Sequence, residues 1–540
     1  MYFFTNDLDH KEKKMNIILI RFFGFIFGFF LVNGCNYPTL VASKRPNIIF
    51  IMSDDHAIPA ISAYDGFLSK IFKTPNLDRL ADEGMLFNNA FCTNSICTPS
   101  RAAILTGKYS HMNGVYTLEE KISDDEITFP KLLRDAGYYT GMIGKWHLHT
   151  EPKGFDYWKV MVGQGLYHNP VYCEKGKGWS RDPEGGVGTR YQGYVTDINT
   201  GFALEFLENR PKNKPFSLLL HYKAPHDEWE YSEKYETLLA EVDVPEPRTL
   251  YDDYNSRGRG IRACTQKIGE NHTFYDHETG HLKGDKRKAA QYQSYIKRYL
   301  RCVASVDENV GRVLRYLDDN NLTENTIVVY TSDQGFYLGE HGMYDKRFMY
   351  EESLRIPFLI RYPKAIKAGT VNNDIVTNID FSGTFLDYAN IEIPDEIQGE
   401  SLRDLVEGTT PDDWRQSMYY RYWMHGAHFN IPAHYGIRTQ EYKLIYFYSK
   451  GLGYPSDGKL YPSGNWAFEG NNIQDGEPYW EMYDLKNDPN ELNNLYDDPQ
   501  IFEVRENLRK ELFSLKDYYS DHDEVYPELF ELTRQFSEKN

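Results

Sequence analysis

The sequence predicts an α/β fold, in which helices cover one large sheet and a smaller C-terminal domain carries an antiparallel sheet. The apolar run at 47–52 is continuous, as in a strand that is buried on both faces, and the segments 215–220 and 326–330 also predict strands. Helical patterns separate these runs along the chain, which is typical of α/β proteins. Segments at 419–423, 435–439 and 442–448 have the composition of antiparallel strands.

Length and charge narrow the class of protein. A chain of 540 residues is long enough for a large domain and a smaller one. Aromatic residues make up 15% of the chain, which favours a folded enzyme over a disordered scaffold. The net charge of −19 argues against a nucleic-acid partner. A basic run at 257–301 is either a local focus for an anionic substrate or, more commonly, a solvated helix face.

Residues 1–35 predict a signal peptide for export. Three lysines precede an apolar run at 22–32 that is too short to span a bilayer, and Met15 is an alternative start. The segment 31–35 resembles a bacterial lipobox, which would make Cys35 a lipid anchor on a periplasmic or cell-surface protein. Export permits disulfides, and three pairings remain open for Cys92, Cys173, Cys264 and Cys302.

The first strand, 47–52, ends in Ser53, Asp54 and Asp55. Adjacent carboxylates after a strand are often only a polar loop. Open α/β sheets, however, bind their ligands beyond the carboxyl ends of the strands, so a hard-cation site is a second interpretation. The segment 74–83 then predicts a packing helix, because a capping residue and proline precede apolar residues at helical spacing.

The segment that begins at Cys97 predicts an oxyanion site. Pro99 suits the first turn of a helix, and Gly107 can end it in a left-handed conformation. Cys97 would lie just ahead of the helix N-terminus, where unpaired N–H groups and the dipole favour an anion. Arg101 adds a fixed cation one turn later. A buried or disulfide-bonded cysteine is the alternative for an isolated Cys-Thr-Pro.

Further strands end in polar clusters in the same way. A helix at 129–135 precedes a strand at 138–143, the strand at 215–220 is followed by 221–226, and a long helix at 295–317 precedes the strand at 326–330. A loop at 339–346 leads to a strand at 356–362. A lone histidine after a strand is usually structural. The prediction of a functional site therefore depends on several strands ending in polar residues at the same sheet edge. The converging residues are Asp54, Asp55, Lys145, His147, His226, Asp333 and Gln334.

The polar segment 394–413 contains glycine and proline and predicts a domain boundary. We expect a catalytic domain over 36–405 and a smaller α+β domain over 406–540. The second contains three histidines, His425, His428 and His434. They either reach over the site and bind the sugar of a substrate or are a set of surface histidines.

Cys97, Pro99, Ser100 and Arg101, with the residues up to Gly107, resemble the signature of the type I, formylglycine-dependent sulfatases, and further motifs extend the resemblance over 46–500. The resemblance implies an alkaline-phosphatase-like mixed sheet. It also implies that a formylglycine-generating or anaerobic sulfatase-maturing enzyme converts Cys97 to Cα-formylglycine (3-oxoalanine), whose hydrate is the nucleophile. It implies one Ca²⁺ ion, with the ligands Asp54, Asp55, residue 97, Asp333 and Gln334; many relatives have Asn at the last position.

The same resemblance implies roles for the other residues. Arg101, Lys145 and Lys346 would bind the sulfate oxygens. Asp333 would help to accept the proton of the attacking hydroxyl, His226 would protonate the leaving sugar oxygen, and His147 would deprotonate the second hydroxyl of the hydrate. The implied activity is that of a sulfuric ester hydrolase acting on a sulfated carbohydrate.

Two other functions are alternatives to sulfate ester hydrolysis. A phosphatase or phosphodiesterase of the same superfamily normally has Ser or Thr as nucleophile and two zinc ions, and an inactive polysaccharide-binding lipoprotein would lack one of the site residues.

Segments at 62–66, 106–114 and 434–439 resemble bacterial polysaccharide sulfatases. We expect ulvan as substrate, with glycosaminoglycans carrying N-acetylglucosamine 6-sulfate as the alternative.

Overall fold

The computed structural model describes residues 45–270, 276–450, 476–527 and 530–531. The predicted signal peptide and Cys35 lie outside these residues, so export and lipid attachment stay predictions. Within the described ranges, no helix combines the length and the apolar composition that crossing a bilayer requires. Cys92, Cys173, Cys264 and Cys302 are free buried thiols, so none of the three possible disulfide pairings is formed.

A mixed ten-stranded sheet is the centre of the fold, in the order β11-β2-β10-β9-β1-β8-β4-β5-β6-β7. Its strands are β1 (Asn47–Ser53), β2 (Met85–Phe87), β4 (Tyr139–Lys145), β5 (Tyr157–Met161), β6 (Val171–Glu174), β7 (Thr189–Arg190), β8 (Phe216–His221), β9 (Thr326–Ser332), β10 (Phe358–Arg361) and β11 (Thr370–Asn372). The five strands from β9 to β5 in this order are parallel, and β10 and β6 flank them antiparallel. The sequence-predicted fold class is confirmed, and the four strands predicted at the site edge differ from the observed ones by only one or two residues at their ends.

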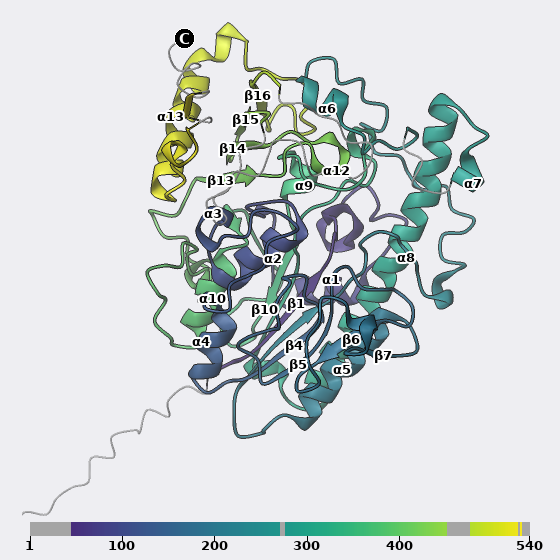
Figure 1. Ribbon diagram of the computed structural model, residues 1–540, viewed down its shortest axis with the longest axis vertical. Helices are drawn as coiled ribbons and strands as arrows, with labels where there is room; N and C mark the ends of the chain where they lie inside the picture. Colours follow the sequence, from purple (N-terminus) through teal and green to yellow (C-terminus); the bar gives the residue numbers. More distant parts are fainter. Residues whose placement is uncertain (1–44, 271–275, 451–475, 528–529, 532–540) are drawn as a thin grey trace, which may run out of the picture. The chain divides into compact units, whose positions relative to one another are not determined.

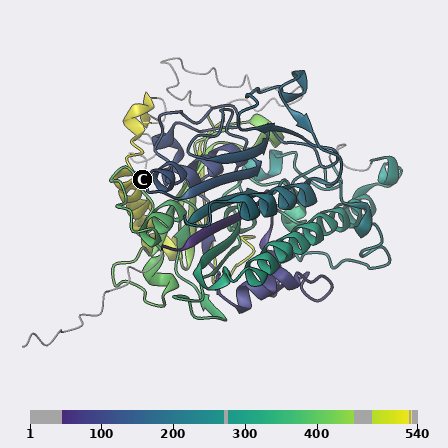
Figure 2. The same cartoon turned by 90° about the horizontal axis from the view of Figure 1, so that it is seen from below.

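Side-chain alternation explains why helices cover both faces of the sheet. In β1, Ile48 and Phe50 pack into one core, whereas Ile49 and Ile51 pack into another. The first core is closed by α2 (Cys97–Thr106), α4 (Phe129–Asp135) and α10 (Asp380–Tyr388). The second is closed by α1 (Pro75–Asp82), α5 (Val195–Asn209) and α8 (Gly284–Asp319). Figures 1 and 2 show these two helical layers on either side of the strands.

The long helix α8 begins at Gly284, eleven residues before the predicted start. Its first turns are charged and largely exposed, so they lack the apolar spacing that predicts a helix. Because the lysines at 283 and 286 are exposed there, the structure favours the solvated-face interpretation of the basic run.

A second, four-stranded antiparallel sheet lies in the C-terminal part of the chain. Its strands are β13 (Ser417–Tyr422), β14 (His434–Thr439), β15 (Tyr442–Phe447) and β16 (Tyr479–Asp484). Helix α13 (Phe502–Tyr518) packs on this sheet through Leu508 and Leu512. The small antiparallel sheet is therefore confirmed, although sequence analysis predicts neither β16 nor α13. The boundary after residue 405 stays a prediction.

The remaining described elements are short connections. They include β3 (Ala90–Phe91), β12 (Val376–Thr377), α3 (Ser110–Asn113), α6 (Arg259–Ala263), α7 (Asp276–Thr279), α9 (Glu351–Leu354), α11 (Arg403–Val406) and α12 (Ala427–Asn430).

Candidate active site

The parallel strands bring the predicted site residues to one edge of the large sheet. Ser332 at the end of β9 lies beside Ser53 of β1, and His221 at the end of β8 lies beside Met52. Lys145 is the last residue of β4, the next strand in the sheet. The side chains that follow these strand ends therefore start within one region.

Three buried carboxylates, Asp54, Asp55 and Asp333, lie in contact with one another at this edge. Ligand oxygens from the three lie within 4.8 Å of each other. Asp55 has a φ of 66°, and its peptide N–H donates to Oδ1 of Asp333 at 3.2 Å. Burial raises the pKa of Asp333 to about 7, and the charge of Asp54 adds to the effect. Three acids this close to one another ionise together only when positive charge lies beside them.

The acids and Gln334 fit a hard divalent cation. Oε1 of Gln334 is buried and has no hydrogen-bond partner among the described residues, whereas Nε2 donates to Asp55. Carboxylate and amide oxygens are the ligands that Ca²⁺ and Mg²⁺ prefer, whereas zinc sites usually include histidine nitrogen or cysteine sulfur. The residues that would hold such an ion are Asp54, Asp55, Asp333 and Gln334.

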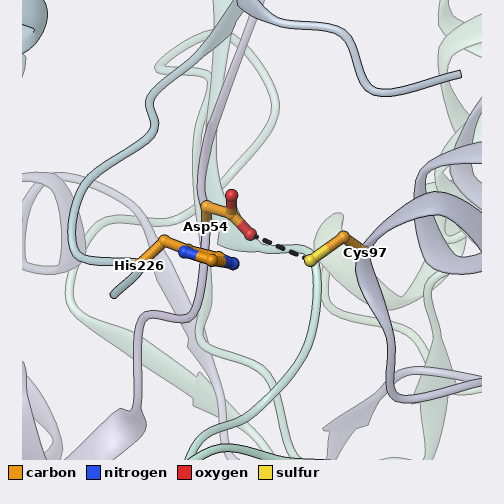
Figure 3. A group of neighbouring side chains, drawn as sticks. All are labelled: Asp54, Cys97 and His226. Atoms are coloured by element: carbon orange, nitrogen blue, oxygen red, sulfur yellow. Dashed lines mark hydrogen bonds between the residues drawn. The ribbon is translucent and has the colours of Figure 1, made fainter. Parts of the chain in front are cut away.

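Cys97 points into the same region from the N-terminus of α2. Figure 3 shows its thiol directed at Asp54, with His226 on the other side of the carboxylate, and Sγ lies 3.4 Å from Oδ1 of Asp54. Gly107 ends the helix with a φ of 66°, as the sequence predicts. The helix begins at Cys97 rather than after it, because Ile96 takes the extended capping conformation. The side chain of Cys97 therefore lies at the positive end of the helix dipole.

Arg101 holds the acids in position. Its Nε and Nη2 atoms donate to Oδ2 of Asp333 at 3.0 and 2.8 Å, and Nη2 lies 3.6 Å from Oδ1 of Asp54. Nη1 donates to the carbonyl of Lys145 at 2.9 Å. A planar guanidinium makes such paired contacts where an ammonium cannot. Arg101 therefore supplies a fixed positive charge between the acids and the end of β4.

Two lysines flank the acids. Nζ of Lys145 pairs with Asp54 and lies 4.0 Å from Sγ of Cys97. Nζ of Lys346 lies 2.6 and 2.8 Å from the two carboxylate oxygens of Asp55. Burial would lower the pKa of Lys346, but the Asp55 carboxylate raises it well above its usual range. Lys346 is thus held as a cation, and Lys145 places its amino group 4.0 Å from Sγ of Cys97, an arrangement that suits an anionic substrate group.

His226 pairs with its neighbour Asp227. Nδ1 of His226 lies 2.7 Å from the carbonyl oxygen of Asp227 and also contacts its carboxylate, while Nε2 lies 3.7 Å from Oδ2 of Asp55. Burial would lower the pKa of His226, but the carboxylates of Asp227 and Asp54 raise it to about 10. His226 is therefore a protonated imidazolium at neutral pH, with Nε2 turned toward the site.

Replacing Asp227 with asparagine is expected to shift the activity to lower pH. The imidazolium is lost as pH rises through the pKa of His226, and removing the Asp227 charge lowers that pKa. The high-pH limb of kcat should therefore move down by about one unit. The measurement is the pH dependence of kcat, and Glu228→Gln, at the exposed next residue, is the control that should leave the limb in place. An unmoved limb in Asp227→Asn would contradict this assignment.

His147 and His221 are neutral histidines at the ends of β4 and β8. Burial and the nearby charge of Lys145 hold the pKa of His147 well below its usual range. Burial, with Arg101 adding to it, does the same for the pKa of His221. Nδ1 of His147 has no hydrogen-bond partner among the described residues, so it is available to accept a proton. His221 is not among the site residues predicted from the sequence, although it begins the 221–226 cluster.

Besides His221, three polar residues near the site are not among those predicted from the sequence. Gln164 accepts a hydrogen bond from Lys145. Lys223 is buried and lies 4.8 Å from the ring centre of Tyr167. Arg347 follows Lys346 and stacks 5.5 Å from the Phe429 ring centre. The sequence contained a signal for two of them. Lys223 belongs to the polar cluster 221–226, and Arg347 directly follows the polar loop 339–346.

The three histidines of the C-terminal part lie in different surroundings. Burial lowers the pKa of His428 to about 3, and the charges of Arg347 and Lys346 add to the effect, so His428 lies near the site. His425 accepts a hydrogen bond from the Ala433 N–H at 3.2 Å. His434 is fully buried among the rings of the small sheet. The expectation that His434 binds sugar is therefore wrong in this structure, because its ring fills a core position, and the surface alternative fails for the same reason.

Comparison with known families agrees with this arrangement. The family model "Sulfatase" matches residues 46–391, and the model "N-sulphoglucosamine sulphohydrolase, C-terminal" matches 339–461 and 470–518. The first match alone covers more than half of the chain and contains all of the strands that carry the site.

Individual relatives give the same result. The chain is 41% identical over 538 residues to an N-acetylglucosamine-6-O-sulfatase of Bacteroides thetaiotaomicron, covering 91% of this chain and 89% of the relative. It is 28% identical over 549 residues to an ulvan-active sulfatase of Formosa agariphila, covering 96% and 92%. A solved complex with the substrate D-glucosamine-2-N,6-O-disulfate matches with a TM-score of 0.80 and 41% identity, covering 89% and 99%. The chain therefore belongs to the sulfatase family, whose members hydrolyse sulfate esters.

Proposed function

We propose that this sulfatase removes 6-O-sulfate groups from N-acetylglucosamine or glucosamine units of sulfated carbohydrates. The observation that carries the proposal is the 41% identity to an N-acetylglucosamine-6-O-sulfatase over 91% of this chain. The ulvan-active relative is 28% identical. The comparisons thus favour the alternative substrate of the sequence analysis over ulvan, which was expected first.

The cations around residue 97 support binding of a sulfate ester. Lys145 and Lys346 lie on either side of the acids, and Arg101 adds a third fixed charge. Preformed positive groups stabilise negative charge that grows on the sulfate oxygens in the transition state. A bound Ca²⁺ ion would add to this charge and lower the pKa of a coordinated hydroxyl.

We infer that a formylglycine-generating or anaerobic maturing enzyme converts Cys97 to formylglycine. Its hydrate supplies two hydroxyls on one carbon, one to attack sulfur and one to expel sulfate afterwards. Asp333, with its raised pKa, is suited to accept a proton from the attacking hydroxyl. His226 is charged and suited to protonate the leaving sugar oxygen, and neutral His147 is suited to accept the proton of the second hydroxyl.

Removing the metal is expected to destabilise the protein and abolish its activity. Adding Ca²⁺ to the chelated protein should raise the free energy of unfolding by about 2.7 kcal/mol when free Ca²⁺ is a hundred times its Kd. Thermal unfolding with and without Ca²⁺ measures this effect, and Asp55→Asn should lose most of it. Stabilisation by Zn²⁺ but not by Ca²⁺ would refute the assignment of a hard-cation site.

The substrate proposal is tested with matured protein and defined sugars. N-acetylglucosamine 6-sulfate and a 6-O-sulfated glycosaminoglycan oligosaccharide should be desulfated with a kcat/KM at least about tenfold above that for ulvan oligosaccharides, a preference of roughly 1.4 kcal/mol. Sulfate release measured by ion chromatography gives both values. Preferential release of sulfate from ulvan oligosaccharides would contradict the proposal and support ulvan as the substrate.

A further inference from the structure

The segment 163–167 contacts two different parts of the site. It follows β5, whose last residue, Met161, pairs with Lys145 at the end of the parallel strand β4. The chain leaving β5 therefore passes close to Lys145. Gly163 and Gly165 have φ values of 61° and 68°, a conformation that residues with a Cβ rarely adopt. These two glycines let the chain turn on both sides of Gln164.

Gln164 is one of the hydrogen-bond acceptors that surround the amino group of Lys145. A lysine ammonium has three N–H donors. Asp54 and Oε1 of Gln164 each lie within hydrogen-bond distance of Nζ, and Sγ of Cys97 lies 4.0 Å from it. The carboxylate and the amide together fix the direction of the third N–H, toward residue 97. Since the amide is neutral, it does this without cancelling the charge of the lysine.

Tyr167, three residues later, holds the loop of His226. Its hydroxyl donates to the carbonyl oxygen of His226. The side chain is 1% exposed, and Nζ of Lys223 lies 4.8 Å from its ring centre. The hydroxyl therefore fixes the backbone that carries the His226 imidazole.

We propose that 163–167 is a positioning segment in which Gln164 orients Lys145 and Tyr167 orients His226. The inference rests on the proposed roles of these two residues. They act at opposite ends of the bond that breaks, because Lys145 contacts the sulfate oxygens and His226 protonates the departing oxygen. Substitutions of Gln164 and of Tyr167 should therefore differ in how strongly the loss of kcat depends on the leaving group of the substrate.

The test uses full-length, matured protein and two substrates, N-acetylglucosamine 6-sulfate and 4-nitrophenyl sulfate, whose phenolate leaves without a proton. Gln164→Met keeps the side-chain length but removes the acceptor, and should lower kcat about tenfold on both substrates while raising the inhibition constant of inorganic sulfate. Tyr167→Phe should lower kcat about tenfold on the sugar sulfate and less than about twofold on the aryl sulfate. Gln164→Asn, with a shorter arm, should behave like Gln164→Met.

The outcomes distinguish failure of the proposed function from failure of the positioning roles. Wild-type protein with modified residue 97 that hydrolyses neither substrate refutes the proposed function. Active wild type with Gln164→Met and Gln164→Asn unchanged in kcat and in sulfate inhibition refutes the positioning role of Gln164. Equal losses on both substrates in Tyr167→Phe, with a lowered melting temperature, refute the role of Tyr167 and show that it only stabilises the fold.

Discussion

Replacing Cys97 with serine is expected to lower steady-state sulfate release by at least about a thousandfold. A serine hydroxyl lies at the same place, beside Asp54 and at the N-terminus of α2, so attack on sulfur remains possible. It has no second hydroxyl on the same carbon, so sulfate cannot be expelled after the attack. The variant should therefore stop after at most one turnover.

Two measurements check this expectation. Steady-state release of sulfate gives the loss in turnover, and intact-mass analysis after incubation with substrate should show one added sulfate on the serine variant. Cys97→Ala is the matched control and should show neither turnover nor added mass. A serine variant with wild-type turnover would refute the formylglycine mechanism.

Replacing His226 with alanine is expected to lower kcat for the sugar sulfate by about 10² to 10⁴. The imidazolium beside Asp227 is placed to protonate a leaving alkoxide, which is a poor leaving group without a proton. An aryl sulfate needs no such proton, so the loss on 4-nitrophenyl sulfate should be much smaller. The measurement is kcat on both substrates for the wild type and the variant. Equal losses on both would assign His226 to sulfate binding instead.

The strands that carry the site were predictable because burial on both faces leaves a simple pattern. The continuous apolar run of β1 has no polar side, and the same holds for β9. The positions of Asp54 and Asp333 then follow from the rule that parallel strands end at one edge. Helix α4 was predictable for a similarly local reason, because Pro130 lies in its first turn.

The loop residues of the site were not predictable because tertiary packing sets their backbone conformation. Gln164 lies between two glycines with positive φ, and Arg347 itself has a φ of 100°. Neither value follows from the residues next to them in sequence. The burial of His434 was not predictable either, because histidine is polar and was expected at an exposed position. Pairing of β14 with β15 places it beside Phe447 in an aromatic core.

The burial of Cys97 has a consequence for when the proposed conversion of this residue would take place. The residue is 1% exposed and is enclosed by Asp54, Lys145 and Gln334. A protein catalyst that oxidises a side chain has to surround it, and the finished enzyme leaves no access for such contact. The conversion that we propose must therefore precede folding. On this proposal, the modifying enzyme would meet an unfolded polypeptide and would recognise the linear stretch around Cys97 rather than a folded surface.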